Sequence, residues 1–251
     1  MRKKSKTRSP SVEKILSVKI STLSKQKIIN LISHRTEQKL STVIFTPNTQ
    51  ILLDAQSSPR NLLLLNSADI NIPDGIGVLL ASKILGGNIK KRISGIELGE
   101  ALLALAEKKG YRVFLLGAKK GVAKKAKKAL KKHYPKLKIC GTHHGYFKKS
   151  GKENQKIIQK IRAARPDMIF VCMGYPEQEK WIAKNAPKIS SARVFIGLGG
   201  SLDVWSGNTR RAPLPIQLMG LEWLYRTVKE PRRARIFIDI PRFLFKAWKS
   251  K

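Results

Sequence analysis

Asp74 is the residue of this chain best placed to do chemistry, because it lies in the turn Pro73-Asp74-Gly75 directly after a short apolar stretch, residues 68–72. The chain holds 16 Asp and Glu against 51 Lys and Arg, so a lone carboxylate at a strand end is a candidate general base facing an anionic substrate. The alternative is structural: Asp74 caps the following helix by binding the amides of Gly75 to Gly77. The turn taken alone favours the cap.

Three further turns place polar or glycine residues where an apolar, strand-like run ends. In a parallel α/β sheet, ligands bind outside the carboxyl ends of the strands, so we expect these turns to lie close to the site. The helix expected after Gly117 offers free amides to a phosphate. Gln178, which follows another strand, either reads a base or sugar edge or is solvated. The three turns are Thr46-Pro47-Asn48, Leu116-Gly117-Ala118 and the segment from Gly197 to Asp203.

Several familiar catalytic motifs are absent from the sequence. Leu202 occupies the last glycine position of a G-x-G-x-x-G pattern that starts at Gly197, and no Walker-type phosphate loop occurs. There is no D-x-D pair for a metal-bound nucleotide sugar and no G-x-S-x-G nucleophile. His143 and His144 have no Cys or carboxylate at ligand spacing, which argues against zinc. Classical dehydrogenases and P-loop enzymes are therefore disfavoured.

Alternating strand-like and helix-like segments indicate the fold that must position these residues. The strand-like segments are continuously apolar, which is typical of a parallel sheet buried on both faces. We therefore predict an α/β, Rossmann-like fold with a mostly parallel sheet and helices on both faces. The expected strands are 42–45, 69–73, 112–116, 137–140, 168–172 and 193–197, and the expected helices are 75–85, 96–109, 119–132, 152–164 and 176–186.

Charge divides the 251-residue chain into three expected parts: a basic, flexible tail (1–11), an α/β catalytic core (12–207) and a small, helical, basic and aromatic appendage (208–251). Pro231 and Pro241 are expected to divide the appendage into short helices. Such a segment lies on an anionic lipid surface or closes over a phosphorylated ligand, or it docks onto the core by its aromatic side chains. The net charge of +35 calls for a polyanionic partner, and composition does not choose between nucleic acid, membrane and phosphorylated substrate.

Cys140 and Cys172 lie in apolar runs and are expected to be reduced, buried residues. No apolar run approaches the roughly 20 residues that span a bilayer, and the basic N-terminus is not followed by the apolar region of a secretory signal. We therefore expect a cytoplasmic protein whose membrane contact, if present, is peripheral.

The motifs together, in their order along the chain, resemble the WecG/TagA/CpsF glycosyltransferases (glycosyltransferase family 26) from about residue 15 to about residue 245. Ordered agreement of so many motifs is far more specific than any one of them. The motifs are Thr46-Pro47-Asn48, Pro73-Asp74-Gly75-Ile76-Gly77, Arg92-Ile93-Ser94-Gly95, Phe114-Leu115-Leu116-Gly117, His144-Gly145-Tyr146-Phe147, Gly174-Tyr175-Pro176-Glu177-Gln178-Glu179-Lys180-Trp181, Gly199-Gly200-Ser201-Leu202-Asp203, Arg211-Ala212-Pro213, Gly220-Leu221-Glu222-Trp223-Leu224-Tyr225-Arg226 and Glu230-Pro231-Arg232-Arg233.

The resemblance implies an inverting glycosyltransferase that works at the inner face of the plasma membrane without a required metal. It implies transfer of an N-acetylmannosamine-type sugar from a UDP donor to undecaprenyl-diphosphate-linked N-acetylglucosamine, in teichoic acid or surface polysaccharide synthesis. An alternative is another UDP-hexose donor for exopolysaccharide. A homo-oligomer is compatible with this interpretation.

The resemblance also implies roles for single residues. Asp74 matches the proposed catalytic base, and Thr46 and Asn48 match polar residues of the same pocket. The basic appendage supplies further positive charge near the departing diphosphate, as a metal does in other enzymes. The positions that match or adjoin ligand contacts are Arg92, Gly117, Gln178 and Asp203 in the core, and Arg226, Arg233 and Arg235 in the appendage.

Three departures and two competing interpretations qualify this assignment. Glu97 stands where many relatives carry Asp two residues after the glycine, and Glu177 stands where Lys is common. The arginine spacing after Pro231 is irregular, which bears on the match of Arg235; none of the three removes a proposed catalytic group. A nucleic-acid-binding protein would explain the charge, but no helix-turn-helix, zinc finger or RNP signature supports it, so we expect no nucleic-acid partner. Retention of Asp74 and Gln178 argues against a non-catalytic relative.

Overall fold

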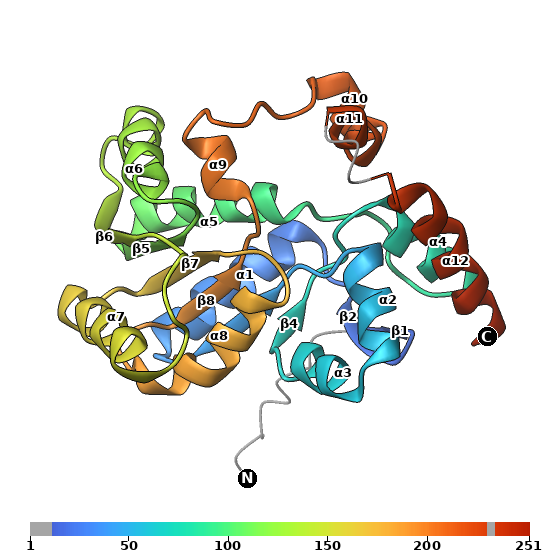
Figure 1. Ribbon diagram of the computed structural model, residues 1–251, viewed down its shortest axis with the longest axis horizontal. Helices are drawn as coiled ribbons and strands as arrows, with labels where there is room; N and C mark the ends of the chain where they lie inside the picture. Colours follow the sequence, from blue (N-terminus) through green and yellow to red (C-terminus); the bar gives the residue numbers. More distant parts are fainter. Residues whose placement is uncertain (1–11, 230–233) are drawn as a thin grey trace, which may run out of the picture.

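The computed structural model describes residues 12–229 and 234–251, and within them six parallel strands form one sheet with helices on both faces (Figure 1). The strand order is β4-β3-β8-β7-β5-β6. An antiparallel hairpin, β1 (Val12–Ile15) with β2 (Val18–Ser21), forms a separate two-stranded sheet that packs beside β4. The predicted fold class is confirmed. The six strands are β3 (Thr42–Phe45), β4 (Ile70–Asn71), β5 (Arg112–Gly117), β6 (Lys138–His143), β7 (Met168–Cys172) and β8 (Val194–Gly197).

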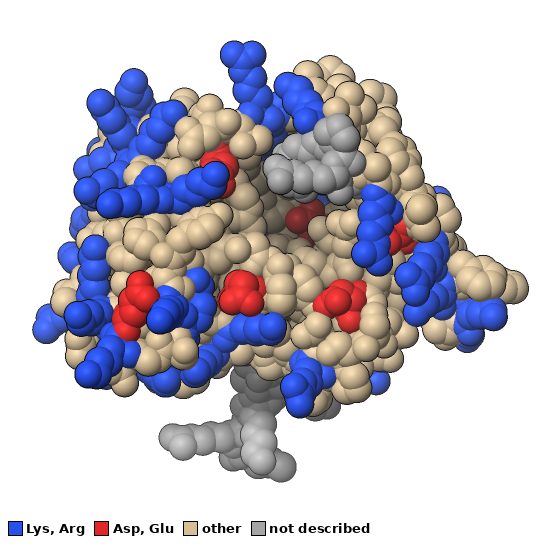
Figure 2. Space-filling view, viewed as in Figure 1, with Lys and Arg blue, Asp and Glu red and all other residues tan. Residues whose placement is uncertain are grey.

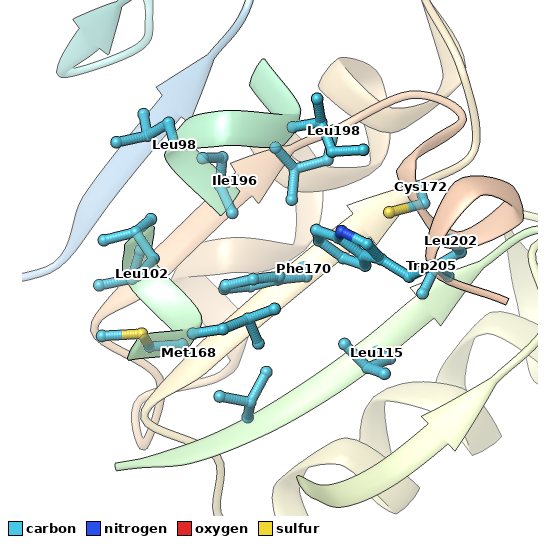
Figure 3. Packing of buried hydrophobic residues seen from close by; sticks show 14 of the residues in the cluster. Leu98, Leu102, Leu115, Met168, Phe170, Cys172, Ile196, Leu198, Leu202 and Trp205 are labelled. Carbon is cyan, nitrogen blue, oxygen red and sulfur yellow. The ribbon is translucent and has the colours of Figure 1, made fainter. Parts of the chain in front are cut away.

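Alternation along each strand divides the core into two hydrophobic layers. In β5, Val113 and Leu115 point into one layer, and Phe114 and Leu116 into the other, all with no exposed surface. Both faces of the sheet are therefore covered, which explains why the central strands read as unbroken apolar runs. Figure 3 shows Phe170 of β7 and Trp205 packed side by side in the first layer.

The helices divide between these two layers. The first layer is covered by α1 (Lys25–Glu37), α5 (Gly95–Lys109), α6 (Val122–His133) and α9 (Ser201–Trp205). The second layer is covered by α2 (Thr49–Ser57), α3 (Pro59–Asn66), α4 (Ile76–Ile84), α7 (Gly151–Ala164) and α8 (Glu177–Asn185), which runs into the 3₁₀ turn η1 (Ala186–Lys188). Helices α1, α2 and α3 and the hairpin are elements that the sequence patterns above do not predict.

The strand order creates a crevice between β5 and β7. The chain leaves β5 toward β6 and leaves β7 in the opposite direction, toward β8. Because such a reversal places the two connections on opposite faces, a gap opens at the carboxyl ends of the two strands. Gly117 and Cys172, the last residues of β5 and β7, are paired at this point.

The C-terminal segment forms α10 (Leu214–Leu218), α11 (Glu222–Lys229) and α12 (Ile236–Lys249). Helix α12 packs against α2 and α4 through Phe243 and Ala247, both without exposed surface (Figure 1). The predicted break at Pro241 is wrong, because α12 continues through that residue. Burial of Phe243 offsets the one backbone hydrogen bond that a proline removes. Pro231 and the predicted tail, residues 1–11, lie outside the described residues.

We expect Gly117→Ala to lower the free energy of unfolding by at least about 3 kcal/mol. Gly117 has φ +143°, and a Cβ there would lie 2.1 Å from the carbonyl oxygen of Cys172, which the neighbouring strand holds in place. The matched control is Gly121→Ala, at φ +88° with no atom within 4 Å of the added carbon, which should cost only about 1 kcal/mol of backbone strain. Urea unfolding of both variants tests this, and equal losses would contradict it.

Candidate active site

A cavity of about 960 Å³ lies at the carboxyl ends of β3, β4 and β8, roofed by the C-terminal helices. Figure 2 shows the surface hollowed near its centre, with an acidic side chain deep inside and basic side chains over much of the surrounding face. The cavity brings together seven residues that the sequence singled out. These are Thr46, Asn48, Asp74, Arg92, Gln178, Arg226 and Arg235.

A second cavity of about 740 Å³ opens beside the first, at the crevice between β5 and β7. The two cavities share Gly174, Gly199 and Gly200 as lining residues. Asp203 lines the second cavity, as does Ala118, whereas Gly117 lines neither and instead shapes the turn before Ala118. The site residues predicted from sequence therefore divide between two adjoining chambers.

The Asp74 carboxylate does not cap its own helix. Its Oδ2 accepts a hydrogen bond from the amide of Gly95, the first residue of α5, at 3.3 Å, while its own amide binds Pro47 at 3.3 Å. A helix N-terminus favours negative charge, so α5 helps to hold this carboxylate in the cavity. The structure thus replaces the expected cap of residues 75–77 with a contact from a different helix.

Burial raises the pKa of Asp74 to about 6. The Gly95 amide, Arg226 and Arg92 oppose this rise, and the nearby carboxylate of Glu222 adds to it. A carboxyl with this pKa is ionised at neutral pH yet more basic than an ordinary aspartate. Those two properties are the ones a general base needs.

Thr46 and Asn48 use their side-chain oxygens within the protein. Thr46 Oγ1 donates to the carbonyl of Gly197 at 3.0 Å, which joins the ends of β3 and β8. Asn48 is the N-cap of α2, and its Oδ1 accepts from the amide of Ile51 at 3.1 Å. Both residues line the cavity, and these bonds hold its wall in place.

The cavity arginines connect the core to the C-terminal helices. Arg92 donates to the carbonyl of Gln217 in α10, and Arg226 pairs with Glu222 at 2.6 Å. Arg235 is 75% exposed in its side chain and lies 3.5 Å from Asp239. Arg233 lies outside the described residues.

Arg211 lines neither cavity, but it supports the wall of the larger one, a role that the sequence reasoning missed. One of its terminal nitrogens lies 3.0 Å from Glu97 of α5 and 3.4 Å from Glu222 of α11, so it ties the C-terminal helices to the core. Its place in the Arg211-Ala212-Pro213 motif was the available signal. Glu97, noted only as a departure from relatives, supplies the core end of this link.

Among residues 12–229 and 234–251, no group of three or more His, Cys, Asp or Glu side chains is arranged to hold a metal ion. His143 Nδ1 contacts the carbonyl of His144 at 2.8 Å. In the same part of the chain, no helix is long and apolar enough to cross a bilayer.

Together these features define an α/β enzyme, with one candidate base set among arginines in a cavity at the carboxyl ends of parallel strands. Residues 13–251 match the Glycosyl transferase WecG/TagA/CpsF family, and the chain belongs to this family. The resemblance stated from the motifs is confirmed, and the enzyme class is that of a glycosyltransferase.

Three of its curated relatives carry the name N-acetylglucosaminyldiphosphoundecaprenol N-acetyl-beta-D-mannosaminyltransferase. The protein of Bacillus spizizenii is 40% identical over 83% of this chain and 79% of its own length. That of Bacillus subtilis is 38% identical over 87% and 83%, and that of Staphylococcus aureus strain MW2 is 37% identical over 83% and 80%.

We expect Asp74→Asn to stabilise the fold at pH 8 by up to about 3 kcal/mol, because each pKa unit corresponds to 1.36 kcal/mol. The folded-state pKa of Asp74 lies above its ordinary value of 3.8, so ionisation costs stability as the pH rises from about 4 through 6. The asparagine keeps an oxygen for the Gly95 amide.

Urea unfolding at pH 8 and at pH 4.5 measures this effect, and the gain should shrink at the lower pH. The control Asp69→Asn removes a carboxylate that binds the Val43 amide at 2.8 Å and Arg35 at 3.3 Å, so it should lose stability instead. If Asp74→Asn were less stable than the wild type at pH 8, the buried Asp74 carboxylate would not destabilise the fold, and the prediction would be wrong.

Proposed function

We propose that this protein transfers N-acetylmannosamine from a UDP donor to N-acetylglucosamine carried on undecaprenyl diphosphate, with inversion at the anomeric carbon. The observation that carries the proposal is the Asp74 carboxylate, with its raised pKa, in a cavity that also holds Arg92 and Arg226. The shared name of the relatives supports the identity of acceptor and sugar.

Each group has a defined role in the proposed reaction. Asp74 takes the proton of the acceptor hydroxyl as that oxygen forms a bond to the anomeric carbon of the donor. The bond from this carbon to the UDP oxygen breaks, and UDP leaves with the electron pair. Arg226, Arg92 and Arg235 line the cavity and supply positive charge to the departing diphosphate, a role that a metal ion fills in other transferases.

The two chambers suggest a division between the substrates. The smaller one lies at the crevice between β5 and β7, where open α/β sheets bind nucleotides, and it is lined by Asp203 and Tyr146. We assign the uridine of the donor to it. The larger chamber, which holds Asp74 and is bordered by α12, then receives the acceptor, and the reacting atoms meet near Gly199 and Gly200, where the chambers join.

The C-terminal helices carry an exposed apolar surface close to the larger chamber. Trp248 is 60% and Phe245 is 54% exposed, their rings are 6.0 Å apart, and Lys249 Nζ lies 5.0 Å from the Phe245 ring. Aromatic side chains beside lysines favour the interface of an anionic membrane. We therefore propose that this surface lies on the inner face of the plasma membrane, where a lipid-linked acceptor is reached. Other large apolar side chains exposed in the C-terminal segment are Leu214, Leu218, Met219, Val228, Phe237 and Ile238.

A transfer assay tests the reaction. The protein is incubated with a panel of UDP-sugars and a lipid-diphosphate N-acetylglucosamine, and the product is identified by mass and linkage. We expect UDP-N-acetylmannosamine to be the preferred donor. Preference for another UDP-hexose would replace the proposed sugar, and no transfer from any donor would contradict the function.

Asp74→Asn should lower kcat about 10² to 10⁴-fold, because the acceptor proton then lacks a base. In the wild type, kcat/KM should fall about tenfold per pH unit below pH 6 and level off above it, since only ionised Asp74 takes a proton. Asp69→Asn, which lies before the amino end of β4 and does not line the cavity, should leave the profile unchanged. Near-normal turnover of Asp74→Asn would show that Asp74 is not the general base.

Flotation with vesicles containing anionic lipid tests the membrane surface. The double variant Phe245→Gln, Trp248→Gln should lose most binding while keeping its fold, because both side chains are already largely exposed. The control Leu63→Gln removes an exposed leucine of α3, 72% exposed and outside the C-terminal helices, and should bind as the wild type does. Equal binding by all three proteins, or tight sequence-selective DNA binding at physiological salt, would contradict this assignment.

A further inference from the structure

Glu179 is a buried carboxyl for which the proposed reaction has no use. It lies in the first turn of α8 and is 1% exposed, in a helix that also supplies Trp181 and Ile182 to the second hydrophobic layer. Its Oε1 accepts a hydrogen bond from Gln178 Nε2 at 2.9 Å. Within the described part of the chain its Oε2 has no partner, and burial raises the pKa of the carboxyl to about 7. A buried group held at this cost calls for a reason.

The contact with Glu179 selects one orientation of the Gln178 amide. Gln178 is 2% exposed, and its Oε1 accepts from the amide of Gly199 at 2.9 Å while its Nε2 faces Glu179. Rotating the amide by half a turn would place an NH₂ against the Gly199 N–H and an oxygen against the carboxyl. Both contacts would be lost when Glu179 is ionised, so its carboxylate acts together with the Gly199 N–H in fixing which end of Gln178 meets Gly199.

The turn held in this way separates the two chambers. Gly199 and Gly200 line both of them. A Cβ on Gly197 would lie 2.8 Å from Gln178 Nε2, so the backbone of the turn is in close contact with this amide. The Gly197 carbonyl in turn accepts from Thr46, whose side chain packs on Gly95, the residue that binds Asp74. A chain of contacts therefore runs from Glu179 to the candidate base.

We propose that Glu179 is a positioning residue for the transfer site: it orients the Gln178 amide, and through it the Gly197–Gly200 turn where the donor and acceptor chambers meet. Glu179 touches no substrate, because it has almost no surface toward either chamber. The effect on transfer rests on the proposed function, whereas the effect on the turn does not.

Amide hydrogen exchange at Gly199, followed by ¹⁵N NMR without any substrate, tests the link to the turn. Glu179→Met keeps the volume and removes the acceptor, so the Gly199 amide should exchange at least tenfold faster than in the wild type. Glu179→Gln keeps an acceptor oxygen for Gln178 and should retain most of the protection. Glu179→Ala, which cannot overfill the site, is made in parallel in case the methionine does not fit.

Kinetics with the preferred donor and the lipid acceptor test the link to transfer. We expect kcat/KM to fall at least tenfold in Glu179→Met and to stay within about threefold of the wild type in Glu179→Gln. The unfolding temperatures of the variants should stay close to that of the wild type. Removing a buried carboxyl with one unbonded oxygen stabilises the fold, and this gain offsets the loss of the hydrogen-bond acceptor for Gln178. A merely structural role would lower stability and activity together and would not be rescued by glutamine.

A double-mutant cycle separates an action through Gln178 from an independent one. If Glu179 works only by orienting this amide, Gln178→Met and the double variant Gln178→Met, Glu179→Met should have the same kcat/KM. Additive losses would overturn the inference. Wild-type exchange at Gly199 in both Glu179→Met and Glu179→Ala would overturn it whatever sugar is transferred, and faster exchange with unchanged kcat/KM would overturn the role in transfer.

Discussion

The parallel pairing of β3, β8 and β7 is the constraint on which the site depends. These strands are buried on both faces and run in one direction. The polar turns that follow them therefore all lie at the same end of the sheet, beyond the carboxyl ends of the strands. The hydrogen bond from Thr46 to the Gly197 carbonyl joins the carboxyl ends of β3 and β8. Asp74 reaches the same edge from β4, at the margin of the sheet, which places it in a cavity between the core and the C-terminal helices.

Charge at this edge is balanced locally although the chain as a whole is strongly basic. Glu222 lies between Arg211 and Arg226, and Glu97 meets Arg211 from the core. Of these charges, Arg226 lowers and Glu222 raises the pKa of Asp74, so the position of α11 bears on the basicity of the candidate base. The C-terminal helices therefore contribute to the electrostatics of the candidate site, in addition to carrying the surface that we propose for the membrane.

Sequence patterns were informative where one physical rule dominated. Continuous apolar runs identified β5, β7 and β8 because strands buried on both faces leave no polar position. Rules that act on single residues were less informative. Pro241 does not end α12, because the packing of Phe243 outweighs the local preference of proline. Asp74 does not cap α4, because its carboxylate binds the first amide of α5, 21 residues further along the chain. Partners far apart in sequence carry no periodic signal.

By itself, the sequence determined the fold class, the family and the set of polar turns, because each depends on residue types at short spacing that a linear pattern records. Only the tertiary structure decided how those residues work together: that Gln178 is held by Glu179 and bound to Gly199, that Arg211 bridges Glu97 and Glu222, and that Asp74 has a raised pKa. Burial, hydrogen-bond direction and electrostatic surroundings are properties of neighbours in space, and folding alone makes these residues neighbours.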